Sequence, residues 1–310
     1  MLPRRHRLGA GDPTGRPYVP LAFSILLSAI LLAACGGPGP GAPSPTPALP
    51  TPTLPAPTET PVPAAATVNG EVIPQADFEA ELERYKAAQT ALGKTVSDEE
   101  AAATVLEDLI AQMLLAQAAA KDGFTVDDAA LQERIDSLAG EIGGTDALSA
   151  WQSAHGYTDE SFRASLRRGI AAAWMRDKII GAVPTTADQV HARQILIYNE
   201  ERAGQVYDDL LAERIDFDEF AALVDPVTHG DIGWFPHGYL PYKSIEQAAF
   251  ALQPGEFSSV TPTDLGFHIL KVIERGQRPL SPDALLVLQD KALQDWVSQQ
   301  RQQSAVVTGP

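Results

Sequence analysis

Between Gly230 and Arg275 the chain carries four short motifs in a fixed order, and no other part of the sequence limits the possible folds so strongly. They are Gly-Asp-Ile-Gly-Trp-Phe from Gly230, Ala-Ala-Phe-Ala-Leu from Ala248, Pro-Gly-Glu from Pro254, and Gly-Phe-His-Ile-Leu-Lys-Val from Gly266. The two glycines that bracket Ile232 permit a tight backbone turn. The aromatic and aliphatic residues that follow supply enough apolar surface for one small domain with a pocket.

Length and charge limit the possible domain organisation and the possible partners of the chain. At 310 residues and 45% apolar content, the chain can bury a sizeable core and is long enough for more than one domain. Its formal net charge is −17. Such a field repels phosphate backbones and anionic lipid head groups, so we do not expect nucleic acid as a partner. The simplest consequence of the charge is solubility.

The amino terminus has the pattern of an export signal. Four arginines precede an apolar run, residues 19–34, that is too short for a comfortable membrane span. The run ends in Leu-Ala-Ala-Cys-Gly, and small residues before a cysteine resemble a bacterial lipoprotein processing site. Cys35 is the sole cysteine, which excludes an intramolecular disulfide and leaves a buried thiol or a chance residue as the alternatives. We therefore predict a lipoprotein signal peptide over residues 1–35 and a lipid on Cys35 that holds the protein to a membrane.

Residues 36–65 are mostly Pro, Gly, Ala, Thr and Ser, a composition that cannot form a core and predicts a disordered, proline-rich linker. We expect order to begin at Ala66. Two β-prone pieces surround Asn69-Gly70 there, which is a strong hairpin pattern.

Amphipathic helices follow the hairpin as far as residue 180. The longest contains Leu-Ile-x-x-x-Leu-Leu from Leu109, and capping residues separate it from the helices after it. The Thr-Val-Asn-Gly-Glu-Val-Ile opening and this helix make residues 66–185 similar to the amino-terminal helical domain of SurA-type and PrsA-type chaperones. The alternative is an unrelated helical domain, because amphipathic helices are common.

After Pro184 the pattern changes to a strand, residues 190–197, followed by two short helices that lead into the motif-rich stretch. A last helix, residues 280–303, has an apolar side that would be exposed to water if it stood alone. We expect it to pack on the amino-terminal helices, so that residues 186–277 form an insertion into one helical module.

The four ordered motifs resemble the parvulin family of peptidyl-prolyl isomerases, over about ninety residues. The resemblance implies an α+β fold in which a helical chaperone-like module carries an inserted parvulin-like domain, itself a small antiparallel sheet flanked by helices. It also implies catalysis of rotation about Xaa-Pro bonds, whose resonance barrier is about 18–20 kcal/mol. No covalent step is needed. An apolar slot and a few hydrogen-bonding groups can favour the twisted amide.

The resemblance also assigns site residues. It implies an apolar slot for the proline ring, lined by Ile232, Phe235, Leu240 and Ile245, with Phe250 behind it. Ordinary core packing is the alternative at each of these positions. Among the polar groups it implies catalytic roles for His268, Thr263 and Asp225. A structural histidine is the alternative for His268, and a solvated turn aspartate before proline is the alternative for Asp225.

The chain departs from the family at two positions. Gln194 stands where the family places its first histidine, and it can both donate and accept a hydrogen bond to His268. His191 cannot replace that histidine, because an odd separation on a strand points it to the opposite face. The second departure is Ile245 where an aromatic floor is usual, and Tyr242 could fill that space. Both departures argue for weakened catalysis.

We found no metal-ligand spacing and no phosphate-binding glycine loop, so we expect neither a metal nor a cofactor. The first hypothesis is a lipid-anchored extracytoplasmic foldase that isomerises Xaa-Pro bonds in unfolded or partly folded exported polypeptides. The second is a non-catalytic holdase with a degenerate parvulin domain, which Gln194 favours. The third is a lipoprotein spacer of an envelope complex, which the pocket makes less attractive.

Overall fold

The computed structural model describes residues 63–309. The predicted signal peptide, the predicted lipidation site Cys35 and all but the last few residues of the predicted linker lie outside that range. Within it, contacts divide the chain into a small unit, Asp127–Trp151, and a large unit made of the remaining residues.

The small unit contains helix α3 (Asp128–Ile142) and most of α4 (Thr145–Ala154). The Asp127 side chain caps α3 by accepting a 2.8 Å hydrogen bond from the backbone N–H of Ala130. Helix α3 ends at Gly143, whose φ of 104° is open to glycine but strained for other residues.

In the large unit, the chain opens with the predicted hairpin, which the structure confirms. Strands β1 (Ala64–Val68) and β2 (Glu71–Pro74) pair antiparallel around Asn69 and Gly70, which have φ values of 53° and 86°. Both values suit the turn type that Asn-Gly favours. Strand β1 begins at Ala64, two residues before the predicted start of order.

A third strand, β7 (Val306–Thr308), pairs antiparallel with β1 and was not predicted. The Asn69 side chain secures it, because its oxygen accepts from the backbone N–H of Ala305 at 2.9 Å and its nitrogen donates to the Ser304 hydroxyl at 3.2 Å. The carboxyl-terminal segment is therefore a helix followed by a strand, and not the helix alone that the sequence pattern indicated.

Four long helices build the rest of this module: α1 (Gln75–Ala91), α2 (Asp98–Lys121), α5 (Asp159–Gly181) and α9 (Pro282–Gln303). Helix α2 is long and apolar enough to cross a membrane by length and composition alone. Its Ile110, Met113 and Leu114, however, are buried in a cluster shared with β1 and β2. Helix α9 packs its apolar side, which includes Leu293 and Trp296, against residues of α2 and α5.

The second sheet has the strand order β4-β3-β6-β5 and is antiparallel throughout. Its strands are β3 (Thr186–Ile197), β4 (Asp231–Pro236), β5 (Thr261–Thr263) and β6 (Gly266–Pro279), and its helices are α6 (Glu200–Leu211), α7 (Phe217–Val224) and α8 (Lys243–Ala251). Helices around a small antiparallel sheet confirm the predicted α+β class.

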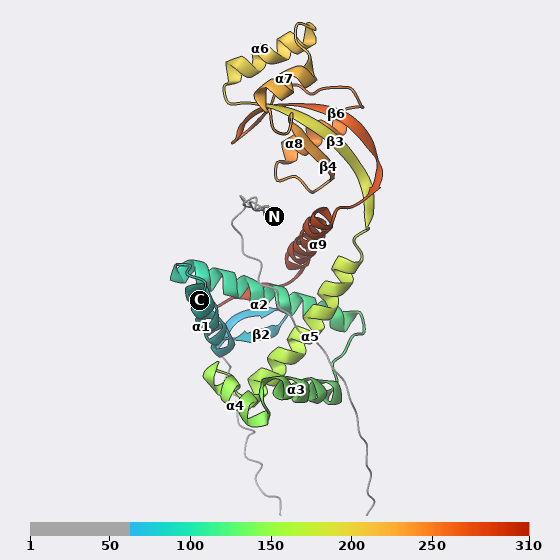
Figure 1. Ribbon diagram of the computed structural model, residues 1–310. Coiled ribbons are helices and arrows are strands. Elements are labelled where there is room, and N and C mark those ends of the chain that lie inside the picture. Colours follow the sequence, from blue (N-terminus) through green and yellow to red (C-terminus); the bar gives the residue numbers. More distant parts are fainter. Residues whose placement is uncertain (1–62, 310) are drawn as a thin grey trace, which may run out of the picture. The chain divides into compact units, whose positions relative to one another are not determined.

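Helices cover both faces of this sheet, with α6 and α7 on one side and α8 on the other (Figure 1). Side chains alternate along each strand, so Ile195 and Ile269 pack under α6 and α7, whereas Ala192 and Leu270 pack under α8. We call these two sides the α6–α7 face and the α8 face.

Candidate active site

Three predicted site residues from three strands form one hydrogen-bonded chain. His268 on β6 is buried, with 3% of its surface exposed. Its Nδ1 lies 2.9 Å from Oε1 of Gln194 on β3, and its Nε2 lies 2.8 Å from Oγ1 of Thr263 on β5. By strand alternation Gln194 and His268 belong to the α8 face, beside Ala192 and Leu270.

These contacts fit the neutral form of His268 with its proton on Nδ1. A carboxamide oxygen can only accept, so Nδ1 carries the proton and donates it to Gln194. The unprotonated Nε2 then accepts from the Thr263 hydroxyl. Burial lowers the pKa of His268, which favours the same neutral form. The chain from Gln194 to Thr263 is thus uncharged and satisfied at both ring nitrogens.

The predicted slot residues all belong to one apolar cluster on the α8 face, but they differ in exposure. Phe235 and Ile245 are 0% and 4% exposed, so they lie beneath the surface as core residues and do not line an open slot. Phe250 is partly buried, and the His237 ring stacks on it with centroids 3.5 Å apart. Ile232 and Leu240, also partly buried, are the two predicted lining residues that remain.

Tyr242 completes this apolar wall. It is partly buried and packs against the same cluster, which contains Ile245. A hydrogen bond to the Asp264 carboxylate raises the pKa of the Tyr242 hydroxyl. Because Asp264 directly follows Thr263, Tyr242 connects the apolar wall to the end of the polar chain.

Asp225 does not join the polar chain. It follows α7, and its carboxylate accepts hydrogen bonds from the backbone N–H groups of Val227 and Thr228, both at 3.1 Å, and from the Thr228 hydroxyl. The Thr228 hydroxyl, followed by these backbone groups, lowers the pKa of Asp225. These contacts are those of a turn aspartate, and a catalytic role for Asp225 stays a prediction.

Gly230, the first glycine of the motifs, fixes this turn against the strand that carries Gln194. The Gln194 N–H donates to the Gly230 carbonyl at 2.8 Å, and φ at Gly230 is 73°. A Cβ atom at Gly230 would lie 2.1 Å from the Gln194 carbonyl oxygen, so no other residue fits without a backbone shift.

His191 lies apart from the polar chain, as its odd separation from Gln194 predicts. Its Nε2 is 2.9 Å from Asp231 Oδ1, and its ring stacks on Trp234 at a centroid distance of 5.4 Å. Neither contact involves His268, so Gln194, and not His191, is the partner of His268 Nδ1.

Glu246 on α8 is a residue that the sequence analysis missed. It is 8% exposed, and its carboxylate accepts from the backbone N–H groups of Gly238 at 2.8 Å, Tyr239 at 3.2 Å and Leu240 at 3.3 Å. The buried charge therefore holds the loop that presents Leu240 to the apolar wall. A glutamate in the first turn of a helix is normally exposed, so its sequence position gave no indication of this role.

Within the described residues, no group of three or more His, Cys, Asp or Glu side chains could hold a metal ion. What the site offers is a neutral hydrogen-bonding chain beside an apolar wall. Such a surface can bind an apolar ring and desolvate the amide next to it.

Comparison with family models gives two matches in chain order. Residues 55–176 match the SurA-like N-terminal domain, and residues 186–274 match the PPIC-type peptidyl-prolyl isomerase domain, also called rotamase. The second range spans β3 to β6 and includes the Gln194–His268–Thr263 chain.

Among curated proteins, the foldase protein PrsA of Caldanaerobacter subterraneus is 29% identical over 237 residues, which cover 66% of this chain and 72% of the relative. The chaperone SurA of Nitrosospira multiformis is 37% identical over 113 residues, or 33% of this chain and 26% of the relative. A crystal structure of PrsA from Bacillus cereus covers 76% of this chain and 84% of its own, at 19% identity and a TM-score of 0.41. The two family matches, together with the site geometry, show that the chain joins a SurA-like N-terminal domain to a parvulin-type peptidyl-prolyl isomerase domain.

Proposed function

We propose that this protein is a membrane-anchored extracytoplasmic foldase that catalyses cis–trans isomerisation of Xaa-Pro bonds in exported polypeptides. The observation that carries the proposal is the Gln194–His268–Thr263 chain, which lies on the same face of the sheet as Ile232 and Leu240. The similarity to a foldase, PrsA, and to a chaperone, SurA, supports a role in protein folding.

The mechanism follows from the barrier to amide rotation. A planar amide owes its stiffness to resonance, and rotation moves charge from the carbonyl oxygen back to the nitrogen. Ile232, Leu240 and Tyr242 would receive the proline ring and exclude water from the adjoining amide, which weakens the solvation of the planar, more polar form. The neutral His268 and its partners hold the rim of this wall in one geometry, so binding favours the twisted amide.

Gln194 defines how much activity we expect. It preserves a neutral link to His268 but not a histidine pair, so it should lower the rate without abolishing it. A tenfold loss corresponds to only about 1.4 kcal/mol, which is comparable with one net hydrogen bond.

The direct test is exchange spectroscopy on a short Xaa-Pro peptide, in which the cis–trans rate is measured with and without protein. We expect a rate above that of the free peptide for the wild type and a lower rate for Asp225→Ala. A folded wild-type protein that leaves the peptide rate unchanged would refute the isomerase proposal.

One observation favours the second candidate, a holdase that binds clients without isomerising them. The Asp225 carboxylate is fully engaged by its own turn, and Gln194 replaces the family histidine. The test replaces residues 186–279 by a short linker. If the rest is an independent holdase, it should melt cooperatively and slow the aggregation of an unfolded client as well as the full chain does. An unfolded circular dichroism spectrum would contradict both that candidate and the insertion model.

The anchor is a separate part of the proposal. Four arginines, an apolar run and the Leu-Ala-Ala-Cys sequence ending at Cys35 support it. Cys35→Ser should release the protein from membranes or leave its leader uncleaved. Normal cleavage together with unchanged membrane fractionation would contradict lipidation at Cys35.

A further inference from the structure

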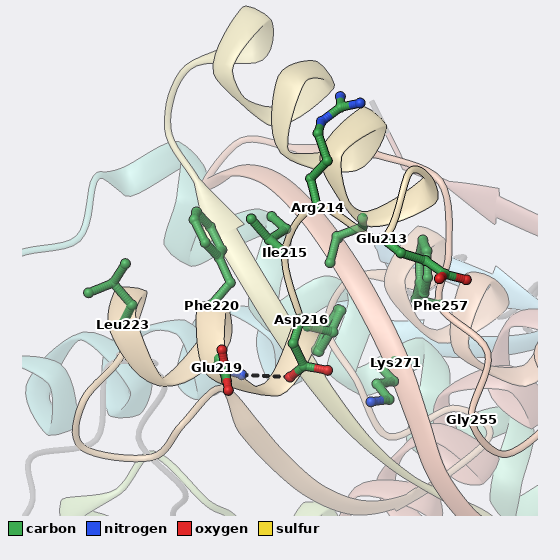
Figure 2. A pocket seen from close by; sticks show the side chains of 12 residues that line it. Glu213, Arg214, Ile215, Asp216, Glu219, Phe220, Leu223, Gly255, Phe257 and Lys271 are labelled. Carbon is green, nitrogen blue, oxygen red and sulfur yellow. Dashed lines mark hydrogen bonds between the residues drawn. The ribbon is translucent and has the colours of Figure 1, made fainter.

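A groove lies on the α6–α7 face, away from the candidate active site. It has a volume of about 680 Å³, and its walls come from the end of α6, the connection to α7, α7 itself and the loop that holds Gly255 and Phe257 (Figure 2). Lys271 is the only residue of β6 among those that line it. His268 and Leu270, on the same strand, belong to the other face, so the groove and the polar chain are on opposite sides of one sheet.

The floor of the groove is aromatic and aliphatic. Phe217, 3% exposed, lies beneath this floor and stacks on Phe257 with ring centroids 6.4 Å apart, and Ile215, Phe220 and Phe257 are partly buried at its surface. At the edge, Leu223 is 73% exposed (Figure 2). Ile215, Phe220 and Phe257 reach the groove as partly exposed side chains among polar neighbours, and apolar side chains that reach solvent in a groove are typical of a binding site for another chain.

The rim of the groove has an excess of negative charge. The lining holds three acidic residues, Glu213, Asp216 and Glu219, against two cations. Both cations are paired: Arg214 contacts Asp209 at 2.7 Å, and Lys271 contacts Asp218 at 2.7 Å, a carboxylate that it shares with Arg193. In the part of the chain that the structure describes, the side-chain carboxylates of Glu213 and Glu219 have no hydrogen bond or ion pair. Two free carboxylates therefore flank an apolar floor.

The Glu213 position sharpens this observation. Glu213 follows the end of α6 with φ of 54°, a left-handed conformation in which glycine is preferred. A glutamate in this conformation costs some conformational energy that a glycine would avoid.

We propose that this groove is a second binding surface for unfolded polypeptides, selective for segments in which Lys or Arg lies within a few residues of a large apolar side chain. The free glutamates complement the cation, and the floor contacts the apolar side chain. Anionic lipid and nucleic acid carry the wrong charge for this rim. The proposal rests on the proposed foldase function for its client class, but it needs no proline and no isomerisation.

The surface gives the protein a way to hold a client while its active site works. A chain bound at the α6–α7 face leaves the α8 face free, so a second segment of the same chain can reach the apolar wall around Leu240. Linking two weak sites in this way raises the effective concentration of the second segment.

The test measures binding of a dye-labelled, proline-free 12-residue peptide of Arg, Phe and Ser to the full chain by fluorescence anisotropy. We expect Glu213→Gln with Glu219→Gln to raise the Kd about tenfold, which is about 1.4 kcal/mol. The matched control is Glu200→Gln with Glu201→Gln, which removes the same charge from exposed residues at the far end of α6. It should change the Kd less than twofold.

Any of three results of the binding assay would overturn the proposal: an unchanged Kd in the groove variant, an equal loss in the control variant, or equal binding of a peptide with Glu in place of Arg. Leu223→Ser gives an independent check, because a residue so exposed can be replaced without unfolding the domain, and it should weaken binding several-fold. A dimer that dissociates in Leu223→Ser would assign the groove to a second copy and also overturn the proposal. The groove variant should retain the isomerase rate on a short Xaa-Pro peptide, so a failure of either proposal can be recognised separately.

Discussion

The two faces of the four-stranded sheet are built from the same strands but present opposite kinds of surface. On the α8 face, polar groups are buried and paired: His268 has a partner at each ring nitrogen, and Glu246 accepts from three backbone amides. On the α6–α7 face, a groove remains open, and Glu213 and Glu219 carry charges without a partner in the described chain. Paired groups fix a geometry, whereas unpaired groups remain available to a ligand.

The alternation of side chains makes this division possible. Along β6, His268 and Leu270 belong to one face, and Ile269 and Lys271 belong to the other. One strand therefore serves both surfaces, and a substitution on one face need not disturb the other.

The largest effect should come from His268→Ala. It removes the centre of the polar chain and leaves Gln194 and Thr263 without their shared partner, so we expect at least a tenfold loss of kcat/KM in peptide exchange. Binding of the Arg-Phe peptide to the groove should not change. The control is Lys271→Met, three residues away on the opposite face, which should retain the isomerase rate within twofold. Equal losses in the two variants would show that the faces are not independent.

Glu246→Gln should have the next largest effect. The amide keeps one acceptor oxygen but turns a nitrogen donor toward backbone N–H groups, so part of the Gly238–Leu240 loop loses its partner. The cost of such unsatisfied buried groups is about 1–3 kcal/mol, measurable as a lower free energy of unfolding in urea. KM should rise more than kcat falls, because in the proposed mechanism Leu240 would contact the proline ring. Glu256→Gln, whose carboxylate caps an exposed turn, should change both quantities little.

A smaller gain is expected from Gln194→His. It restores a second histidine beside His268, and a several-fold increase in kcat/KM would correspond to somewhat less than 1.4 kcal/mol. The groove should be unaffected, because the Gln194 side chain belongs to the α8 face. A decrease in rate would mean that the neutral amide link is better adapted to this site than a histidine pair.

The sequence predicted structure well where a local pattern determines it, and less well where the packing of distant segments determines it. The Asn69-Gly70 hairpin follows from its turn residues, whereas the pairing of Gln194 with His268 on neighbouring strands was implied by the resemblance to the parvulin family. Strand β7 was missed, because three residues carry no period and their place depends on the Asn69 side chain from the other end of the chain.

Within the site, residue type alone could not separate core from lining. Phe235 and Ile232 fit an apolar slot equally well, but only the packing of α8 on the sheet shows that Phe235 is fully buried. The same holds for Glu246 and for the α6–α7 groove. From the sequence alone, Glu213 and Glu219 cannot be distinguished from ordinary surface glutamates, because the groove walls around them depend on the fold.

The smallest predicted effect is a difference in the pH range over which each face of the sheet contributes to stability. Burial lowers the pKa of His268 in the folded protein, whereas in the unfolded chain it titrates near 6.5. Above about pH 6.5 the His268 ring is neutral in both the folded and the unfolded chain, and its contribution to the stability of the fold is fully present. As the pH falls below that value the unfolded chain takes up the proton first, so stability declines until the pH has passed the folded pKa.

The α6–α7 face should respond in a different pH range. Burial alone would raise the pKa of Asp218, but its hydrogen bonds with Lys271 and Arg193 outweigh this and lower it. The stability it contributes is present above about pH 3.9 and is lost only as the pH falls through the lower folded pKa. Melting temperatures measured between pH 8 and 5 should therefore fall more steeply for the wild type than for His268→Gln. We expect a difference of no more than roughly 2–4 °C for a domain of this size. Comparing the slopes of melting temperature against pH for the two proteins removes the contribution of the other histidines. Identical slopes would show that His268 is not held neutral by the fold.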